Sequence, residues 1–244
     1  MPILTLKDVK YAYPDGNTAV AGVSFMVEKG QTVGLVGANG AGKSTLLMML
    51  PGALLHTGGA IEVNGVALTK ATAAQIRRAV GLVFQDADDQ LFTTTVQEDV
   101  AFGPRNMGLA EQDVHRAVQQ ALDQCGIAHL ADRAPYRLSG GERKLAAIAS
   151  VLSMEPELLI MDEPSASLDP RARRGIIGLL NSLPMTKLIA SHDLDLVWEV
   201  CSRVIVLKDG RVEAEGDARE LLSNQELMER CGLELPLRLQ REPG

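Results

Sequence analysis

The chain has 244 residues, of which 46% are hydrophobic and only 3% aromatic, and its formal net charge is −7. This length suits one large α/β domain or a core with a subdomain, built around an aliphatic interior. The negative charge argues against nucleic acid or an anionic lipid surface as the main partner. Cys125, Cys201 and Cys231 are odd in number and contain no C-x-x-C pattern, so we expect free thiols in a reducing compartment.

The amino-terminal residues show no signal peptide, because Lys7, Asp8 and Lys10 interrupt the start. No apolar run approaches the length of a membrane span. We therefore expect a cytoplasmic chain, which another subunit must hold in place if it works at a membrane.

The first ninety residues read as strands around one glycine-rich loop. Residues 3–11 alternate loosely, as in an antiparallel strand, and turn chemistry follows at 14–17. Residues 32–36 form the short apolar run typical of a buried parallel strand. Further strands are expected at 22–27, 60–63 and 81–84, the last followed by a polar loop at 85–90.

Residues 37–44 read Gly-Ala-Asn-Gly-Ala-Gly-Lys-Ser, the complete phosphate-loop pattern G-x-x-x-x-G-K-[ST]. Its glycines let backbone N–H groups approach phosphates, and the helix starting near Lys43 adds a positive dipole end. Lys43 should reach the β- and γ-phosphates, and Ser44 should bind Mg²⁺. Strand–loop–helix context favours a nucleotide site over a chance glycine loop. The expected nucleotide contacts are Gly37, Ala38, Asn39, Gly40, Ala41, Gly42, Lys43, Ser44 and Thr45.

Hydrophobic periodicity changes from a strand to a helix pattern at Val96. One helix face is expected over 114–125 and another over 145–152. Strands resume at 158–161, 187–190 and 203–207, and Asp209-Gly210 predicts a hairpin turn. We therefore expect one domain with a nucleotide-binding core at 1–92 and 155–222, a helical subdomain at 93–154, and a tail at 223–244 that is helical and then loose.

Asp162 and Glu163 follow the apolar run 158–161. Ligands gather at the carboxyl ends of parallel strands, so Asp162 is placed to support Mg²⁺ and Glu163 to polarise an attacking water. Alone, this pattern is equally typical of a strand that ends in solvated acids. The phosphate loop elsewhere in the chain favours the site.

Residues 138–142 read Leu-Ser-Gly-Gly-Glu before an apolar-periodic helix. Ser-x-x-Glu in this place is a capping box, which accounts for Ser139 and Glu142. It does not account for two consecutive glycines, which lower helix propensity. Bare N–H groups at a helix start bind anions, so phosphate contact is a second reading that can hold together with the first.

Six motifs occur in a fixed order: the phosphate loop at 37–44, Gln85, 138–142, Asp162-Glu163, Ser167-Leu168-Asp169, and His192. In this order the chain resembles the ATP-binding-cassette (ABC) ATPases over nearly its whole length. The resemblance implies an α/β fold: a P-loop, RecA-like core with an antiparallel β subdomain and an inserted α-helical subdomain. It implies ATP and Mg²⁺ as cofactors and two subunits that meet head to tail. ATP would then lie between the phosphate loop of one and 139–141 of the other.

The same resemblance assigns roles to single residues. Tyr13 would stack on adenine, with Tyr11 as the near competitor and an ordinary strand tyrosine as the alternative. His192 would contact the γ-phosphate, although a lone histidine after a strand is usually structural. The implied catalytic residues are Glu163, His192 and Gln85. The implied ligands of magnesium are Ser44, Gln85 and Asp162. The residues implied to contact the other subunit's ATP are Ser139, Gly140, Gly141, Glu142 and Asp169.

A narrower resemblance covers 84–92, 95–104 and 141–144. These segments resemble the energy-coupling-factor branch, most closely its cobalt-transport ATPases. Two departures from the common pattern are Glu142 in place of Gln and Ser165 in place of Thr. The carboxylates of Asp86, Asp88 and Asp89 can receive an arginine from a membrane subunit's coupling helix. The alternative is a solvated acidic loop.

We therefore expect an ATP-hydrolysing, energy-coupling subunit of a cobalt or nickel importer, peripheral on the cytoplasmic face of the cell membrane. Its expected partners are a second copy or a paralogous ATPase, an integral membrane coupling subunit and a substrate-binding membrane component, with no nucleic acid. One alternative is the ATPase of another importer, for a vitamin or other solute. A second is a non-transport ABC ATPase, against which the lack of coiled-coil inserts, tandem cassettes and basic surfaces argues. A soluble kinase is disfavoured by 138–142 together with His192.

Overall fold

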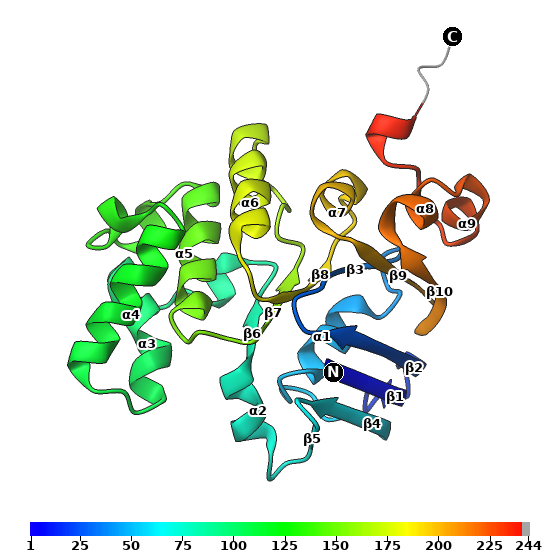
Figure 1. Cartoon of the computed structure of the whole chain (residues 1–244), viewed down its shortest axis with the longest axis horizontal. Helices are drawn as coiled ribbons and strands as arrows, with labels where there is room; N and C mark the ends of the chain where they lie inside the picture. Colours follow the sequence, from blue (N-terminus) through cyan, green and yellow to red (C-terminus); the bar gives the residue numbers. More distant parts are fainter. Residues whose placement is uncertain (241–244) are drawn as a thin grey trace.

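The computed structural model describes residues 1–240, which form two β-sheets and a set of helices (Figure 1). The strands are β1 (Pro2–Ala12), β2 (Thr18–Glu28), β3 (Thr32–Val36), β4 (Gly58–Val63), β5 (Val66–Ala67), β6 (Val80–Val83), β7 (Leu158–Asp162), β8 (Thr186–Ala190), β9 (Arg203–Lys208) and β10 (Arg211–Asp217). The helices are α1 (Lys43–Met49), α2 (Ala73–Ala79), α3 (Val96–Asn106), α4 (Glu111–Gln124), α5 (Gly140–Leu152), α6 (Pro170–Ser182), α7 (Leu194–Val200), α8 (Ala218–Leu222) and α9 (Gln225–Arg230).

The larger sheet has the strand order β10-β9-β3-β8-β7-β6 and is parallel except for β10 at its edge. Helices α6 and α7 lie on one side of it and α1 on the other (Figure 1). Because both faces are covered, its central strands are rich in apolar residues. All five residues of β8 and the first four of β7 are accordingly buried. The carboxyl ends of β3, β7 and β8 meet at one edge, where a ligand site is expected.

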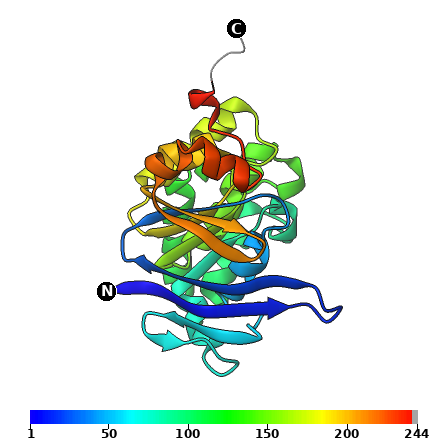
Figure 2. The same ribbon diagram turned by 90° about the vertical axis from the view of Figure 1, so that its right-hand side faces the viewer.

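The smaller sheet is antiparallel, in the order β2-β1-β4-β5. In the view of Figure 2 it lies below the parallel sheet. A hydrophobic cluster that includes Val9, Leu35, Leu46 and Ile61 joins the two sheets to α1. This packing fixes the turn between β1 and β2 beside the start of α1.

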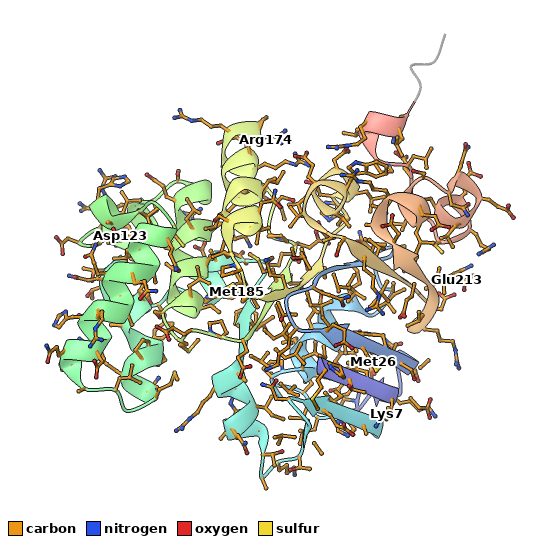
Figure 3. The ribbon with its side chains drawn as sticks, in the orientation of Figure 1. Lys7, Met26, Asp123, Arg174, Met185 and Glu213 are labelled. Carbon is orange, nitrogen blue, oxygen red and sulfur yellow. The ribbon has the colours of Figure 1, made fainter. Side chains whose placement is uncertain are left out.

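Helices α3, α4 and α5 form a layer at the other end of the molecule, and exposed Asp123 on α4 lies far from Lys7 and Met26 on the antiparallel sheet (Figure 3). A second hydrophobic cluster ties this layer to the parallel sheet through residues such as Val100, Ile148 and Met161. The helical layer and the parallel sheet thus share one hydrophobic cluster.

The structure confirms the predicted strands and both predicted helix faces, with ends shifted by a few residues. The hairpin at Asp209-Gly210 is also confirmed, since both residues have positive φ and join β9 to β10. The three cysteines are free and buried. The predicted division at 92, 154 and 222 stays a prediction.

The polar loop expected at 85–90 contains a 3₁₀ turn, η1 (Ala87–Asp89), which Asp86 caps by accepting from the Asp88 N–H at 2.9 Å. His56 is half-buried, whereas His115 and His129 are exposed. One expectation needs correction. Residues 231–240, expected to be loose, are docked, because the Arg238 guanidinium pairs with Asp195 and Glu199 on α7. Residues 241–244 lie outside the described part of the chain. Within residues 1–240, no helix has both the length and the apolar character of a membrane span.

Candidate active site

The phosphate loop connects the carboxyl end of β3 to α1 and walls a cavity of 590 Å³. Gly42 has a φ of 97°, and a Cβ there would overlap the carbonyl oxygen of Ala19, so this position admits only glycine without strain. The Lys43 amine donates to the loop's own carbonyl oxygens, at 2.7 Å from Gly37 and 3.2 Å from Ala38. Burial lowers the pKa of Lys43, against the opposing charges of Glu163 and Asp162. The Lys43 amine is therefore held within the phosphate loop, where it could also bind the phosphates of a nucleotide.

Tyr13 lines this cavity together with Asn17, and its hydroxyl lies 2.9 Å from that of Thr45. Tyr11 packs edge-on against Tyr13, with ring centroids 5.0 Å apart, and does not line the cavity. The geometry thus favours Tyr13 over Tyr11 as the aromatic beside a bound base. The hydrogen bond to Thr45 ties the tyrosine ring to α1.

Asp162 ends β7 and lines a second cavity, of 500 Å³, with Ser44 and Gln85. Burial raises the pKa of Asp162, and the neighbouring Glu163 carboxylate adds to the rise, while the Ser44 hydroxyl and Lys43 oppose it. Its Oδ1 is buried and has no hydrogen-bond partner among the described residues. A buried carboxylate oxygen left without a donor, next to a hydroxyl and an amide, fits a hard divalent cation such as Mg²⁺.

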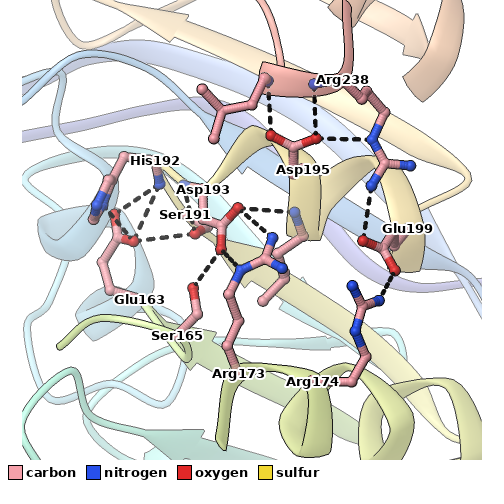
Figure 4. Close-up of polar contacts among 12 residues, drawn as sticks. Glu163, Ser165, Arg173, Arg174, Ser191, His192, Asp193, Asp195, Glu199 and Arg238 are labelled. Carbon is pink, nitrogen blue, oxygen red and sulfur yellow. Dashed lines mark hydrogen bonds and ion pairs between the residues drawn. The ribbon is translucent and has the colours of Figure 1, made fainter. Parts of the chain in front are cut away.

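Glu163 follows directly and is 6% exposed, with a left-handed backbone (φ 45°). Its carboxylate accepts hydrogen bonds from the Ser191 hydroxyl at 3.1 Å and the His192 N–H at 3.1 Å, and lies 2.8 Å from His192 Nδ1 (Figure 4). Left-handed conformations of non-glycine residues cost free energy and persist where surrounding contacts impose them. The end of β8 therefore fixes the direction of the Glu163 carboxylate. The structure brings Glu163, His192 and Gln85 to the wall of the nucleotide cavity.

The next carboxylate, Asp193, joins three segments (Figure 4). Arg173 of α6 donates to it through two nitrogens, at 2.6 and 2.8 Å, and the Ser165 hydroxyl donates at 3.0 Å. It also caps α7 by accepting from the Leu196 N–H at 2.9 Å. Although burial acts to raise it, the pKa of Asp193 is lowered by the Arg173, Leu196 and Ser165 hydrogen bonds. Sequence reasoning missed this pair, since nothing in the spacing of residues 173 and 193 indicates contact.

Residues 139–142 form the predicted capping box: the Ser139 hydroxyl accepts from the Glu142 N–H at 3.4 Å, and the Glu142 carboxylate accepts from the Ser139 N–H at 2.8 Å. Gly141 has a packing reason too, because a Cβ there would lie 2.7 Å from the Cβ of Ala172 on α6. Gly140 has no such reason, since a Cβ there would meet nothing within 4 Å. Packing therefore accounts for Gly141, and phosphate contact stays a prediction for Gly140.

Asp169 caps α6 by accepting from the backbone N–H groups of Arg171 and Ala172, at 2.8 and 2.9 Å. Neither Asp169 nor any residue of 139–142 lines the cavity beside the phosphate loop. Gly140 lines the second cavity together with Ser44, Gln85 and Asp162. Contact of 139–142 and Asp169 with a second subunit's ATP stays a prediction.

The three aspartates next to Gln85 are exposed, and two have partners within the chain. Asp88 lies 3.4 Å from the Arg143 guanidinium, and Asp86 caps η1. Asp89 lines a third cavity, described below. No group of three or more His, Cys, Asp or Glu residues with metal-binding geometry occurs in residues 1–240.

Sequence comparison places this geometry in a family. The sequence profile described as "ABC transporter" matches residues 20–166. A putative ABC transporter ATP-binding protein of Geobacter sulfurreducens is 52% identical over 99% of this chain and 97% of that protein. An energy-coupling factor transporter ATP-binding protein of Methanothermobacter thermautotrophicus is 44% identical over 96% of this chain and 77% of that protein.

Solved structures agree. The cbiO1 protein of Clostridium perfringens, part of the ABC transporter complex cbiONQ, matches with a TM-score of 0.83 and 38% identity over 96% of both chains. A dimeric ATP-binding cassette in a post-hydrolysis state with ADP and Pi matches with a TM-score of 0.79 and 27% identity, over 88% of this chain and 99% of that one. The phosphate loop, the buried carboxylates at the end of β7 and these likenesses together show that the chain belongs to the ABC transporter family, as one of its ATP-hydrolysing subunits.

Proposed function

We propose that this chain is the energy-coupling ATPase of a membrane importer, with cobalt or nickel ions as cargo, and that ATP-driven closure of a dimer is transmitted to a transmembrane partner. The observation that carries the coupling role is an apolar groove directly beside the Gln85 loop. The cargo rests on the resemblance of 84–92 to cobalt-transport ATPases. The likeness to cbiO1 supports the branch.

In the proposed site, Tyr13 stacks on the base and the phosphate loop binds the phosphates through its N–H groups and Lys43. Glu163 accepts a proton from the attacking water. His192 orients the Glu163 carboxylate through its Nδ1 and N–H and faces the γ-phosphate. The strained backbone of Glu163 and its buried hydrogen bonds support this role, because a general base must be held in one direction.

Ser44, Gln85 and Asp162 would hold Mg²⁺, since the unpartnered Asp162 Oδ1 needs a cation or donor. When bound, the ion would neutralise charge on the β- and γ-phosphates. The protein supplies the hydroxyl, amide and carboxylate oxygens, and the hydrophobic strand β7 holds Asp162 in place.

The proposed dimer is head to tail, formed by two copies or by this chain and a paralogue. Ser139, Gly140, Gly141, Glu142 and Asp169 would then face the partner's ATP. The open space at Gly140 supports this arrangement, because a glycine with no internal packing role leaves its N–H accessible to a phosphate of another subunit. The match to a dimeric cassette with ADP and Pi supports it as well.

The groove has a volume of 640 Å³ and lies between β6, α2, α3 and α5. Two of its lining residues, Phe92 and Phe102, are 65% and 47% exposed and pack edge to face, with centroids 4.8 Å apart. Adjacent exposed aromatic rings mark an interaction surface. Asp89 lines both this groove and the cavity that holds Gln85. The exposed Arg77 and Arg78 line the groove as well. A short amphipathic helix that places apolar residues on the floor and an arginine at Asp89 fits this groove, and we assign it to an integral membrane subunit.

Purification of the tagged chain from its native membranes in mild detergent tests this function, with identification of co-purifying proteins and bound metal. An integral coupling subunit with a small cobalt- or nickel-binding membrane protein is the expected result. A vitamin-binding membrane component would change the cargo and keep the branch. Recovery of soluble partners alone would discard transport in favour of a non-transport ATPase.

Charge reversal tests the coupling surface in the same purification. The triple variant Asp86→Lys, Asp88→Lys, Asp89→Lys should lose about tenfold or more of the recovered membrane subunit, while ATP affinity changes less than about threefold. The matched control is Asp123→Lys, Asp132→Lys, Glu229→Lys, which makes the same charge change at exposed positions away from the groove. Equal loss of recovery and ATP binding would indicate local misfolding and contradict the coupling role.

A further inference from the structure

The Gln85 loop is tied to the helix that begins at Gly140. The Lys144 amine of α5, whose side chain is almost wholly buried, donates to the carbonyl oxygens of Phe84 at 3.1 Å and Gln85 at 2.7 Å. An ammonium group has three donors and no acceptor, so it can bind two carbonyl groups at once. Burial lowers the pKa of Lys144, and the charges of Asp162, Asp86 and Glu163 oppose this.

A second link runs between the same two segments. The Gln90 amide nitrogen donates to the Ala147 carbonyl at 2.6 Å and lies 2.9 Å from the Ser150 hydroxyl, and its oxygen accepts from the Phe84 N–H at 3.1 Å. Arg143 adds an exposed ion pair to Asp88. The loop 84–90 is therefore bonded to successive turns of α5.

We propose that Lys144 is a positioning residue that makes the Gln85 loop and the first turn of α5 move as one unit. Lys144 lies one turn after Gly140 and Gly141 on a continuous helix, which transmits displacement along its axis. A change at Gln85 thereby reaches the turn that faces the partner's nucleotide. The inference rests on the proposed roles of Gln85 and of residues 139–141.

Lys187 provides a matched control. Its amine is also buried and also donates to two backbone carbonyl oxygens, of Leu183 at 2.6 Å and Met185 at 3.1 Å. Lys187 lies at the amino-terminal end of the parallel sheet, in β8, opposite the nucleotide cavity. Lys187→Met and Lys144→Met thus remove equivalent contacts in different places.

The experiment measures steady-state ATP hydrolysis and ATP binding by the purified full chain. Lys144→Met should lower kcat about tenfold and leave the ATP Kd within about twofold, because the phosphate loop is untouched. Lys144→Arg, which keeps the donors, should restore part of the rate, and Lys187→Met should retain it. Because Lys144 acts through Gln85, the Lys144→Met, Gln85→Ala double variant should be no slower than Gln85→Ala alone.

A kcat in Lys144→Met equal to wild type, or a double variant in which the two losses multiply, would overturn the inference while leaving Gln85 in its proposed role. An unchanged kcat in Gln85→Ala would instead remove Gln85 from the proposed mechanism and the inference with it. If Lys144→Met does not fold, Gln90→Met breaks the second link and should show the same non-additive loss with Gln85→Ala. Multiplying losses there would equally overturn the inference.

Discussion

At the scale of single residues, the site depends on where one carboxylate points. Glu163→Gln keeps the shape of the side chain and its acceptor oxygen for Ser191, but it removes the proton acceptor. We expect kcat to fall by about 10²–10³-fold with ATP binding retained, and closed dimer to accumulate. Hydrolysis and gel filtration with ATP are the measurements, and Glu62→Gln on β4 is the control. Unchanged hydrolysis would take the role of base away from Glu163.

The sequence predicts site residues that lie in a short contiguous motif. It does not predict residues whose role depends on a contact between segments far apart in the chain. The phosphate loop and Asp162-Glu163 lie within short contiguous patterns, so their surroundings follow from strand and loop placement. Tyr13 and Tyr11 differ by only two positions, and the structure separates them by which ring lines the cavity. Lys144 lies within the segment 141–144, but its buried contact with the Gln85 loop depends on how α5 packs against that loop.

At the scale of elements, Asp193 and Arg173 fasten α6 to the start of α7, directly after His192. Both side chains are largely buried, at 19% and 24% exposed, so Arg173→Met leaves a carboxylate without its main donor. We expect a loss of about 2 kcal/mol in the free energy of unfolding and a lower kcat, since His192 loses its anchored neighbour. Arg174→Met is the control, because the Arg174 side chain is 66% exposed in its pair with Glu199. This substitution should lower the free energy of unfolding by less than about 1 kcal/mol.

The pH dependence of the same pair has a definite sign. The pKa of Asp193 in the folded chain is lower than the ordinary aspartate value of 3.8, so its contribution to stability is present above that value and lost as pH falls below it. We therefore expect the free energies of unfolding of wild type and Asp193→Asn, measured by denaturant between about pH 6 and about pH 3, to become more similar as the pH falls. A constant difference across this range would show that Asp193 acts without its charge.

Elements with a strong hydrophobic pattern were predicted correctly. A segment whose order depends on contacts with a distant helix was not. Helices cover both faces of β7 and β8, and the apolar runs 158–161 and 188–190 that this burial requires are visible in sequence. Residues 231–240 contain Pro236 and charged side chains, a composition typical of a loose chain. It is ordered because Arg238 reaches Asp195 and Glu199 on α7 and lies 5.9 Å from the Trp198 ring centroid. These partners are about forty residues away, beyond any local pattern.

At the scale of the whole molecule, the docked carboxyl-terminal segment closes one wall of the nucleotide cavity, through Gly232 and Leu233. Cys231 is 3% exposed and belongs to the same hydrophobic cluster as Cys125 and Cys201, where burial raises the pKa of each of the latter two thiols to about 12. Cys231 differs in position, because it follows α9 and begins the docked segment, whereas Cys125 follows α4 and Cys201 follows α7. Cys125 and Cys201 therefore react only when the fold opens broadly, whereas Cys231 can react when the segment undocks. The three thiols therefore distinguish local from global opening.

Arg238→Ala should accelerate alkylation of Cys231 about five- to tenfold and leave the alkylation rates of Cys125 and Cys201 unchanged. The reason is that the partly exposed ion pairs and the aromatic contact of Arg238 together stabilise the docked segment by about 1–1.5 kcal/mol. Arg219→Ala is the control, since Arg219 also lies 5.9 Å from the Trp198 ring centroid but on α8, outside the segment. ATP should slow the reaction of Cys231, because nucleotide fills the cavity that the segment walls. Peptide mapping after timed alkylation gives the three rates. Equal acceleration at all three cysteines would mean that Arg238 stabilises the whole fold rather than the docked segment.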